Sequence, residues 1–266
     1  MDPRDVRLTV LAQSKRAGVG HIGSALSVAD IIAALYGRVL RITAPDDPER
    51  DRFVLSKGHA ALALYAALVW RGFISPAQLN TFCAEGSLLG VHPEHAVPGI
   101  GFSSGSLGHG LSYGAGAALA ARLQRSRRRT FVLLSDAECN EGSIWEAAMF
   151  AAHHQLGNLT AIIDLNGQQA LGYTTDVCRI PNMVERWRAF GWNAAEVDGH
   201  SVEALTTALT APAQDRPKML VARTTFGQGV SFMQNQIAWH YLPMTDADYQ
   251  QAIAEVRGAG RSGMSA

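Results

Sequence analysis

The chain alternates between segments with helical spacing of apolar residues and short runs that are apolar throughout. The apolar runs predict buried strands at 53–55, 130–134, 159–164, 192–197 and 219–224. Helical spacing predicts a helix from a cap at Ser27 through residue 40, and further helices at 60–71, 107–122, 143–155, 184–190 and 202–210. Ser75 and Pro76 have the cap and first-position signature of another helix. Fully apolar strands alternating with helices favour an α/β fold, a three-layer, doubly wound, mostly parallel sheet.

No repeat, low-complexity tract or linker divides this pattern. We therefore expect one domain over residues 1–257 and a flexible tail over 258–266. The N-terminus lacks the apolar stretch of a signal peptide, and the longest apolar run, 60–69, is about half the length that spans a bilayer. Three separated cysteines favour reduced thiols in a cytoplasmic protein. Acidic and basic residues balance at 23 each, so charge does not indicate nucleic acid or membrane binding.

Two residues with oxygen ligands follow neighbouring predicted strands. Asp136 comes after the strand at 130–134, and Asn166 after the strand at 159–164. A right-handed crossover would place both at the carboxyl edge of one parallel sheet, where ligands of such sheets bind. A carboxylate, an amide oxygen and a backbone carbonyl would suit a magnesium or calcium ion that also binds phosphate oxygens and water. Taken alone, the pair is better explained by a helix cap and a turn.

The segments around this pair share one resemblance. They are Gly20-His-Ile-Gly-Ser24, Ser56-Lys-Gly-His-Ala60, Gly90-Val-His-Pro-Glu94, Gly105-Ser-Leu-Gly-His-Gly110, Glu138-Cys-Asn-Glu-Gly142, Trp187-Arg-Ala-Phe-Gly-Trp192, Gly227-Gln-Gly-Val-Ser-Phe232 and Trp239-His240. In this order, and over nearly the whole chain, they resemble the transketolase family. Ser135-Asp136-Ala137 resembles the family's Gly-Asp-Gly diphosphate motif, with both glycines replaced.

The resemblance implies a cofactor, thiamine diphosphate, and a metal ion, Mg²⁺ or alternatively Ca²⁺ or Mn²⁺. It implies that Asp136, Asn166 and the backbone carbonyl of Gln168 are the metal ligands. Ala137 would still offer its N–H to the diphosphate, although its methyl group needs space. The residues implied to bind the cofactor are His59, Gly105, Leu107, Asp136, Ala137, Glu138, Asn166 and His240.

The activity implied by the resemblance is transfer of a two-carbon ketol unit from a ketose, by default a sugar phosphate, to an aldose acceptor. His21 and His92 would contact the hydroxyl and carbonyl oxygens of the donor, and His59 and His240 would lie at the diphosphate and the reacting centre. Imidazoles suit proton transfers near neutral pH. His109, His153, His154 and His200 match no catalytic position.

The family's activating glutamate belongs to a second domain, and no segment of this chain resembles its surroundings. The resemblance therefore implies the N-terminal subunit of a split transketolase, with a C-terminal partner subunit that carries the pyrimidine-binding domain. Glu141 would face the partner's glutamate, so the two carboxyl groups would titrate together; alternatively, it favours the N-terminus of the next helix. We expect a heterotetramer with two copies of each chain, with close helix approach at the Ala- and Gly-rich segments 107–122 and 144–155.

Other interpretations fit fewer residues. Gly101-x-Ser103-x-Gly105 matches a hydrolase nucleophile elbow, but Pro98-Gly99 stands where a strand is required. His92 and His95 lack the helical spacing and further ligands of a zinc site. A scaffold that lost its cofactor would have few reasons to retain all these residues. Deoxyxylulose-phosphate synthases and pyruvate dehydrogenase components share the expected fold, but the segments at Ser56 and Trp239 look more like transketolase.

Overall fold

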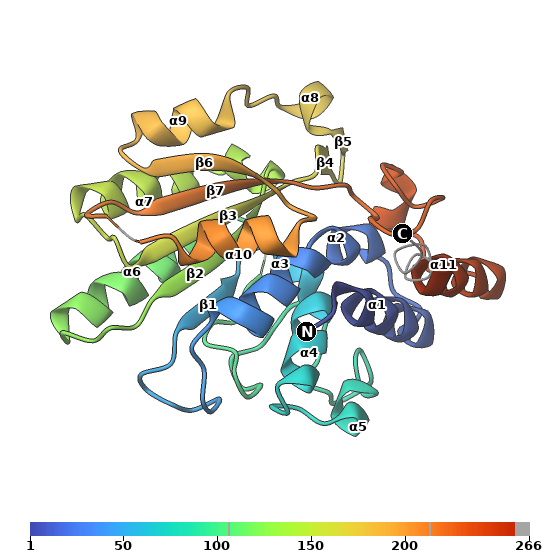
Figure 1. Ribbon diagram of the computed structural model, residues 1–266. Coiled ribbons are helices and arrows are strands. Elements are labelled where there is room, and N and C mark those ends of the chain that lie inside the picture. The colour runs from blue at the N-terminus through green and yellow to red at the C-terminus, as the bar shows by residue number, and fades with distance from the viewer. Residues whose placement is uncertain (106, 213, 259–266) are drawn as a thin grey trace, which may run out of the picture.

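A five-stranded parallel sheet forms the centre of the computed structural model, which describes residues 1–105, 107–212 and 214–258 (Figure 1). The strands are β1 (Arg52–Leu55), β2 (Thr130–Ser135), β3 (Leu159–Leu165), β6 (Asn193–Asp198) and β7 (Lys218–Arg223), in the order β1-β2-β3-β7-β6. All neighbouring pairs are parallel, and the ladder places Ser135 opposite Asp164. The predicted parallel sheet is therefore confirmed.

Helices cover both faces of the sheet. They are α1 (Pro3–Ala17), α2 (Ile22–Ser27), α3 (Ala29–Ala34), α4 (Ala61–Trp70), α5 (Pro76–Leu79), α6 (Gly110–Leu123), α7 (Gly142–His153), α8 (Thr174–Val177), α9 (Met183–Ala189), α10 (Val202–Thr210) and α11 (Asp246–Gly258). Three short 3₁₀ helices are η2 (Gly58–Ala60), η3 (Ala137–Asn140) and η4 (Ile237–His240), and a π-helical turn, η1 (Leu35–Val39), follows α3. Within the described residues, none of the helices has the length and apolar character needed to cross a membrane.

Alternation along β2 shows how the three layers are held together. Phe131 and Leu133 join the larger apolar cluster, which includes residues of α1–α4, α10 and α11. Val132 and Leu134 point to the opposite face and pack with α6, α7 and α9. Because successive side chains of a strand face opposite sides, a strand covered on both faces is apolar at every position. This explains the continuous apolar runs in the sequence.

The N-terminal part of the predicted helix pattern was wrong. The helical segment begins at Ile22, and Ser27 is the last residue of α2, where its hydroxyl donates to the Ser24 carbonyl and to Asp164. Ser27 and Asp30 resemble a helix cap in sequence, but burial and the distant Asp164 determine the role of this serine. The predicted cap at Ser75 is confirmed, and the helix predicted from residue 107 begins at Gly110, after Gly108 with φ +95°.

Helices α1 and α11, which pack against each other (Figure 1), were not predicted. Their signals are nevertheless present: Asp2 caps α1 ahead of Pro3, and Thr245 exchanges hydrogen bonds with Asp248 at the start of α11. The hairpin of β4 (Gln168–Gln169) and β5 (Gly172–Tyr173) beyond the end of β3 was also missed. Of the predicted tail, Gly258 belongs to α11 and 259–266 lie outside the described residues.

Candidate active site

A cavity of about 630 Å³ opens at the carboxyl edge of the sheet. Segments after β1, β2 and β3 reach it, together with η4 and the loops around residues 92 and 105. The residues that line it are His21, Ser24, Lys57, His59, His92, Gly105, Leu107, His109, Ser135, Ala137, Glu141, Asn166, Gln168, Gln169, Ala170, Leu171 and His240. Parallel strands bring their carboxyl ends to one edge, so residues far apart in sequence meet there.

Asp136 and Asn166 meet at this edge through the loop that follows β3. The Asp136 Oδ2 atom accepts the N–H of Gly167 at 2.7 Å, and the Asn166 Oδ1 atom accepts the N–H of Gln168 at 2.9 Å. Asp136 and Asn166 are 4% and 8% exposed, so both side chains are withdrawn from bulk water. Asn166 lines the cavity, whereas Asp136 does not, although its neighbours Ser135 and Ala137 do. A carboxylate or amide oxygen that accepts one hydrogen bond keeps a lone pair for a cation. The arrangement can therefore bind an oxygen-seeking divalent ion.

The charges buried around Asp136 are unbalanced. Asp136, Glu138 and Asp164 contribute three carboxyl groups, and Lys57 contributes one ammonium group. Burial, together with the nearby Asp164 carboxylate, raises the pKa of Asp136 to about 7. A divalent cation would supply positive charge at this point and favour the ionised carboxylate.

Three imidazoles form a triangle in the cavity. The ring centroids of His21 and His59 are 5.4 Å apart, and His240 lies 6.4 Å from His21 and 6.5 Å from His59. The His59 Nε2 atom lies 3.1 Å from the Ser24 hydroxyl. The His21 Nδ1 and His240 Nε2 atoms are buried and lack a hydrogen-bond partner among the described residues. These nitrogens can bond to a ligand that enters the cavity.

Two glycines permit these histidines to approach one another. A Cβ on Gly58 would lie 2.7 Å from the ring of His92, and a Cβ on Gly20 would lie 2.6 Å from the backbone oxygen of Tyr241. At Gly20 the close backbone approach accompanies a hydrogen bond from the His21 N–H to the His240 carbonyl. The motifs containing His21 and His59 thus require glycine for steric reasons.

All four predicted catalytic histidines favour the neutral form. Burial lowers the pKa of His21 and His92, and lowers that of His59 well below its usual value, with Lys57 adding to the effect at His59 and His21. Burial, His21 and Lys57 lower the pKa of His240 to about 4. Neutral imidazoles keep a lone pair, so near pH 7 they can accept protons or hydrogen bonds from hydroxyl groups.

The pKa of His240 predicts an acid-sensitive contribution to stability. Below pH 6.5 the unfolded chain protonates this histidine, whereas the folded chain does not until about pH 4, so stability is lost as pH falls through this window. We expect His240→Asn to reduce the loss of unfolding free energy between pH 7 and pH 5 by roughly 2 kcal/mol. Urea unfolding at the two pH values measures this difference. His153→Asn, on the exposed side of α7, is the control, and an unchanged loss in His240→Asn would contradict the prediction.

Two predicted cofactor-binding groups are engaged within the protein. The Glu138 carboxylate is fully buried and accepts hydrogen bonds from the Ser56 hydroxyl and from the N–H groups of Gly108 and Ser135, so this side chain joins three segments behind the cavity wall. The N–H of Ala137, expected to face a diphosphate, donates to the Asp136 Oδ1 atom at 2.8 Å. A buried carboxylate such as that of Glu138 needs hydrogen-bond donors around it. The N–H of Ala137 lies at the start of a helical turn, where backbone N–H groups lack an intrahelical acceptor.

Glu141 also lines the cavity, as do Gly105 and Leu107. It occupies the cap position of α7, but its side chain makes no capping hydrogen bond and is exposed. Its Cβ and Cγ atoms pack over Gly108, where an added Cβ would lie 2.9 Å away. Its carboxylate therefore remains available on the outer side of the cavity.

Lys57 and Asp164 are functional candidates that the sequence interpretation missed. Lys57 belongs to the Ser56–Ala60 motif and Asp164 ends a predicted strand, but neither residue was assigned a role. The Lys57 ammonium group forms an ion pair with the Asp164 carboxylate, and both side chains are fully buried. The two residues are 107 positions apart, so no local pattern links them. A lysine two positions before His59, just after a predicted strand, was nevertheless a usable signal.

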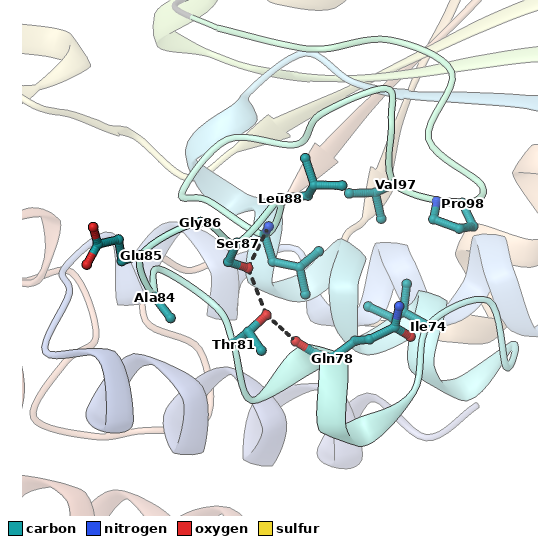
Figure 2. Close-up of a pocket in the computed structure, with 11 residues that line it drawn as sticks. Ile74, Gln78, Thr81, Ala84, Glu85, Gly86, Ser87, Leu88, Val97 and Pro98 are labelled. Carbon is teal, nitrogen blue, oxygen red and sulfur yellow. Dashed lines mark hydrogen bonds between the residues drawn. The ribbon is translucent and has the colours of Figure 1, made fainter.

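The remaining candidates lie elsewhere. Ser103 follows irregular backbone, and its hydroxyl donates to Glu94 while lying 2.9 Å from the His95 Nδ1 atom. Among the described residues, no group of three or more His, Cys, Asp or Glu side chains is arranged to bind a metal ion. A cavity of about 330 Å³ beside α5 is shown in Figure 2, where Thr81 bonds to Ser87; it contains none of the predicted site residues.

Comparison with known proteins identifies the family to which this chain is related. The family model for the transketolase thiamine diphosphate-binding domain matches residues 4–258. The chain is 42% identical over 246 residues to one of the subunits of apulose-4-phosphate transketolase from Phocaeicola vulgatus, covering 91% of this chain and 87% of that protein. The chain belongs to the transketolase family.

Other members of the transketolase family agree with this assignment. The 6-deoxy-6-sulfo-D-fructose transketolase subunit of a Clostridium species is 38% identical over 260 residues, covering 96% of this chain and 94% of that protein. The crystal structure of Campylobacter jejuni transketolase superimposes with a TM-score of 0.90 at 27% identity, over 96% of this chain and 42% of that chain. The present chain thus spans about two fifths of the solved transketolase, and the superposition confirms the expected thiamine diphosphate-binding fold.

The cavity residues fit the cofactor of the transketolase family. Both polar atoms of the Gln168 side chain are buried without a partner among the described residues, as is the Nε2 atom of Gln169. A buried amide without a partner costs about 1–3 kcal/mol, which a polar ligand would offset. The unbalanced carboxyl groups near Asp136 favour a bound cation, and a metal-bound diphosphate would supply that cation together with oxygens that can accept hydrogen bonds from the Gln168 and Gln169 amide groups.

Proposed function

We propose that this chain is the thiamine diphosphate-binding subunit of a two-component transketolase, which transfers a ketol unit from a ketose to an aldose. The convergence of Asp136 and Asn166 beside three neutral imidazoles carries the proposal. Residues 1–257 form the cofactor-binding domain. When bound, thiamine diphosphate supplies the group that accepts the ketol unit, and the protein positions the sugar and transfers protons.

The metal ligands in this proposal are Asp136, Asn166 and the backbone carbonyl of Gln168, and the ion is Mg²⁺. The segments at Gly105, Leu107 and Ala137 lie along the cofactor, while Glu138 contributes by holding Gly108 and Ser135 in place. The neutral imidazoles bind the oxygen atoms of the sugar and transfer protons. His21 and His92 bind hydroxyl and carbonyl oxygens of the donor, and His59 and His240 lie at the diphosphate and the reacting centre.

The proposed donor carries an anionic group. The two subunit relatives are named for sugars with a phosphate and a sulfo group. Lys57 is the only Arg or Lys among the described residues that line the cavity, and its ammonium group is paired with Asp164. We therefore assign recognition of the sugar's anionic end to cationic side chains of the partner chain.

The partner in this proposal carries the pyrimidine-binding domain and the activating glutamate. Its support is the nearly full-length match to a relative that is itself named as one transketolase subunit, compared with the 41% of human transketolase that this chain covers. Apolar side chains on α6 and α7 are exposed, among them Tyr113 at 37%, Met149 at 54% and Phe150 at 41%. Exposed apolar faces of this kind are typical of interfaces. With Glu141 at the start of α7, they suit a heterotetramer with two copies of each chain.

Co-expression with the partner tests the proposed function. We expect the purified chain alone to show no ketol transfer, and the complex to show transfer that depends on Mg²⁺ and thiamine diphosphate. Mass photometry should detect a species with two copies of each chain. Only free single chains, or a complex without transfer from any sugar phosphate or sulfo-sugar donor, would contradict it.

A further inference from the structure

Asp164 lies directly behind the proposed metal site. It is the penultimate residue of β3, two positions before Asn166, and its side chain is fully buried. Its backbone carbonyl accepts the N–H of Asp136 at 3.3 Å. Neither Asp164 nor Asp136 is among the residues that line the cavity, and the Asp164 carboxylate accepts its hydrogen bonds from neighbouring side chains.

Four segments donate to this carboxylate. The Oδ2 atom accepts the Ser27 hydroxyl at 2.7 Å, the Asn166 Nδ2 group at 2.9 Å and the Lys57 ammonium group. The Oδ1 atom accepts the Thr224 hydroxyl, from the segment after β7. Four donors therefore hold this carboxylate, three of them on Oδ2. A buried group held in this way has little freedom to reorient.

The contact with Asn166 determines which way its amide faces. A carboxamide carries its donors and its acceptor on opposite branches. Because Nδ2 donates to Asp164, Oδ1 must point to the other side, where it accepts the Gln168 N–H. The reversed amide would place its oxygen against the Asp164 carboxylate and two donors against each other at Gln168. Both contacts oppose reversal.

We propose that Asp164, neutralised by Lys57, is a positioning residue that orients the Asn166 amide oxygen toward the metal ion. The inference rests on the proposed function, because it presumes that Asn166 is a metal ligand. Partners that orient a metal ligand commonly change metal affinity 10- to 100-fold when removed. Lys57 contributes by making a buried carboxylate tolerable at this position.

Two double variants, each prepared in complex with the partner chain, separate orientation from charge. Lys57→Met/Asp164→Asn removes both charges but keeps an amide oxygen that can accept the Asn166 Nδ2 group. Lys57→Met/Asp164→Leu has nearly the same volume and charge but no acceptor. The measurement is Mn²⁺ affinity by electron paramagnetic resonance with saturating thiamine diphosphate. We expect the asparagine variant to stay within about threefold of wild type and the leucine variant to bind about 10- to 100-fold more weakly.

The outcomes distinguish this inference from the proposed function. If wild type fails to bind Mn²⁺ with the cofactor, the proposed metal site is wrong. If wild type binds but the two double variants bind equally well, Asp164 does not position Asn166. Circular dichroism confirms folding. Should the leucine variant not fold, Asp164→Glu keeps the ion pair and moves the acceptor by one methylene; it should weaken Mn²⁺ binding about tenfold, and unchanged binding would overturn the inference.

Discussion

The Asp136→Asn variant is expected to lose metal-dependent thiamine diphosphate binding, with affinity reduced by about 100-fold or more. The substitution keeps the size of the side chain but removes its negative charge, which is the main attraction for a divalent ion at this site. It also places an amide N–H against one of the two backbone N–H groups that now donate to the carboxylate. Isothermal titration of the cofactor at saturating Mg²⁺, with the variant in complex with the partner chain, measures the effect.

Asp198→Asn is the matched control for this variant. Asp198 also ends a strand of the same sheet, but its carboxylate accepts only the backbone N–H of His200 among the described residues. We expect cofactor affinity within about twofold of wild type for the control, because the residue lies two strands away from β3. Equal affinities for Asp136→Asn, the control and wild type would exclude Asp136 as a metal ligand.

Lys57→Met is expected to destabilise the fold by about 3–5 kcal/mol, because it leaves the Asp164 carboxylate buried without a counter-charge. This corresponds to a decrease of roughly 10 °C in the melting temperature of a domain of this size. The double variant Lys57→Met/Asp164→Asn should recover most of the loss, since no unpaired charge remains. Thermal unfolding without cofactor measures both.

An exposed ion pair supplies the control for the Lys57 prediction. The Lys15 ammonium group lies 2.7 Å from Asp246, whose side chain is 96% exposed. Lys15→Met should cost less than about 1 kcal/mol, because water screens this pair. A Lys57→Met variant that melts at the same temperature as Lys15→Met would show that the buried pair does not stabilise the fold as we infer.

The apolar strands predicted much of the fold and the centre of the site. Their continuous character required a sheet covered on both faces, and the crossover rule then placed Asp136 and Asn166 at one edge. In the structure, the loop that contains Asn166 contacts Asp136, because the N–H of Gly167 donates a hydrogen bond to the Asp136 carboxylate. The metal-binding role itself remains a prediction.

Contacts between distant segments could not be predicted in the same way. Ser27 has the sequence context of a helix cap, but its hydroxyl bonds to a carboxylate 137 residues away. The carboxylate of Glu138 points into the protein because Ser56 and Gly108 happen to lie behind it, and no local spacing indicates this. Helices α1 and α11, in contrast, were missed although their caps were present in the sequence.

A crystal structure of the chain in complex with its partner, Mg²⁺ and thiamine diphosphate would test the metal site most directly. We expect the ion at about 2.0–2.1 Å from the Asp136 carboxylate, the Asn166 Oδ1 atom and the Gln168 carbonyl, with diphosphate oxygens and water completing its coordination. A diphosphate bound outside the cavity, or an ion that neither Asp136 nor Asn166 contacts, would contradict the account.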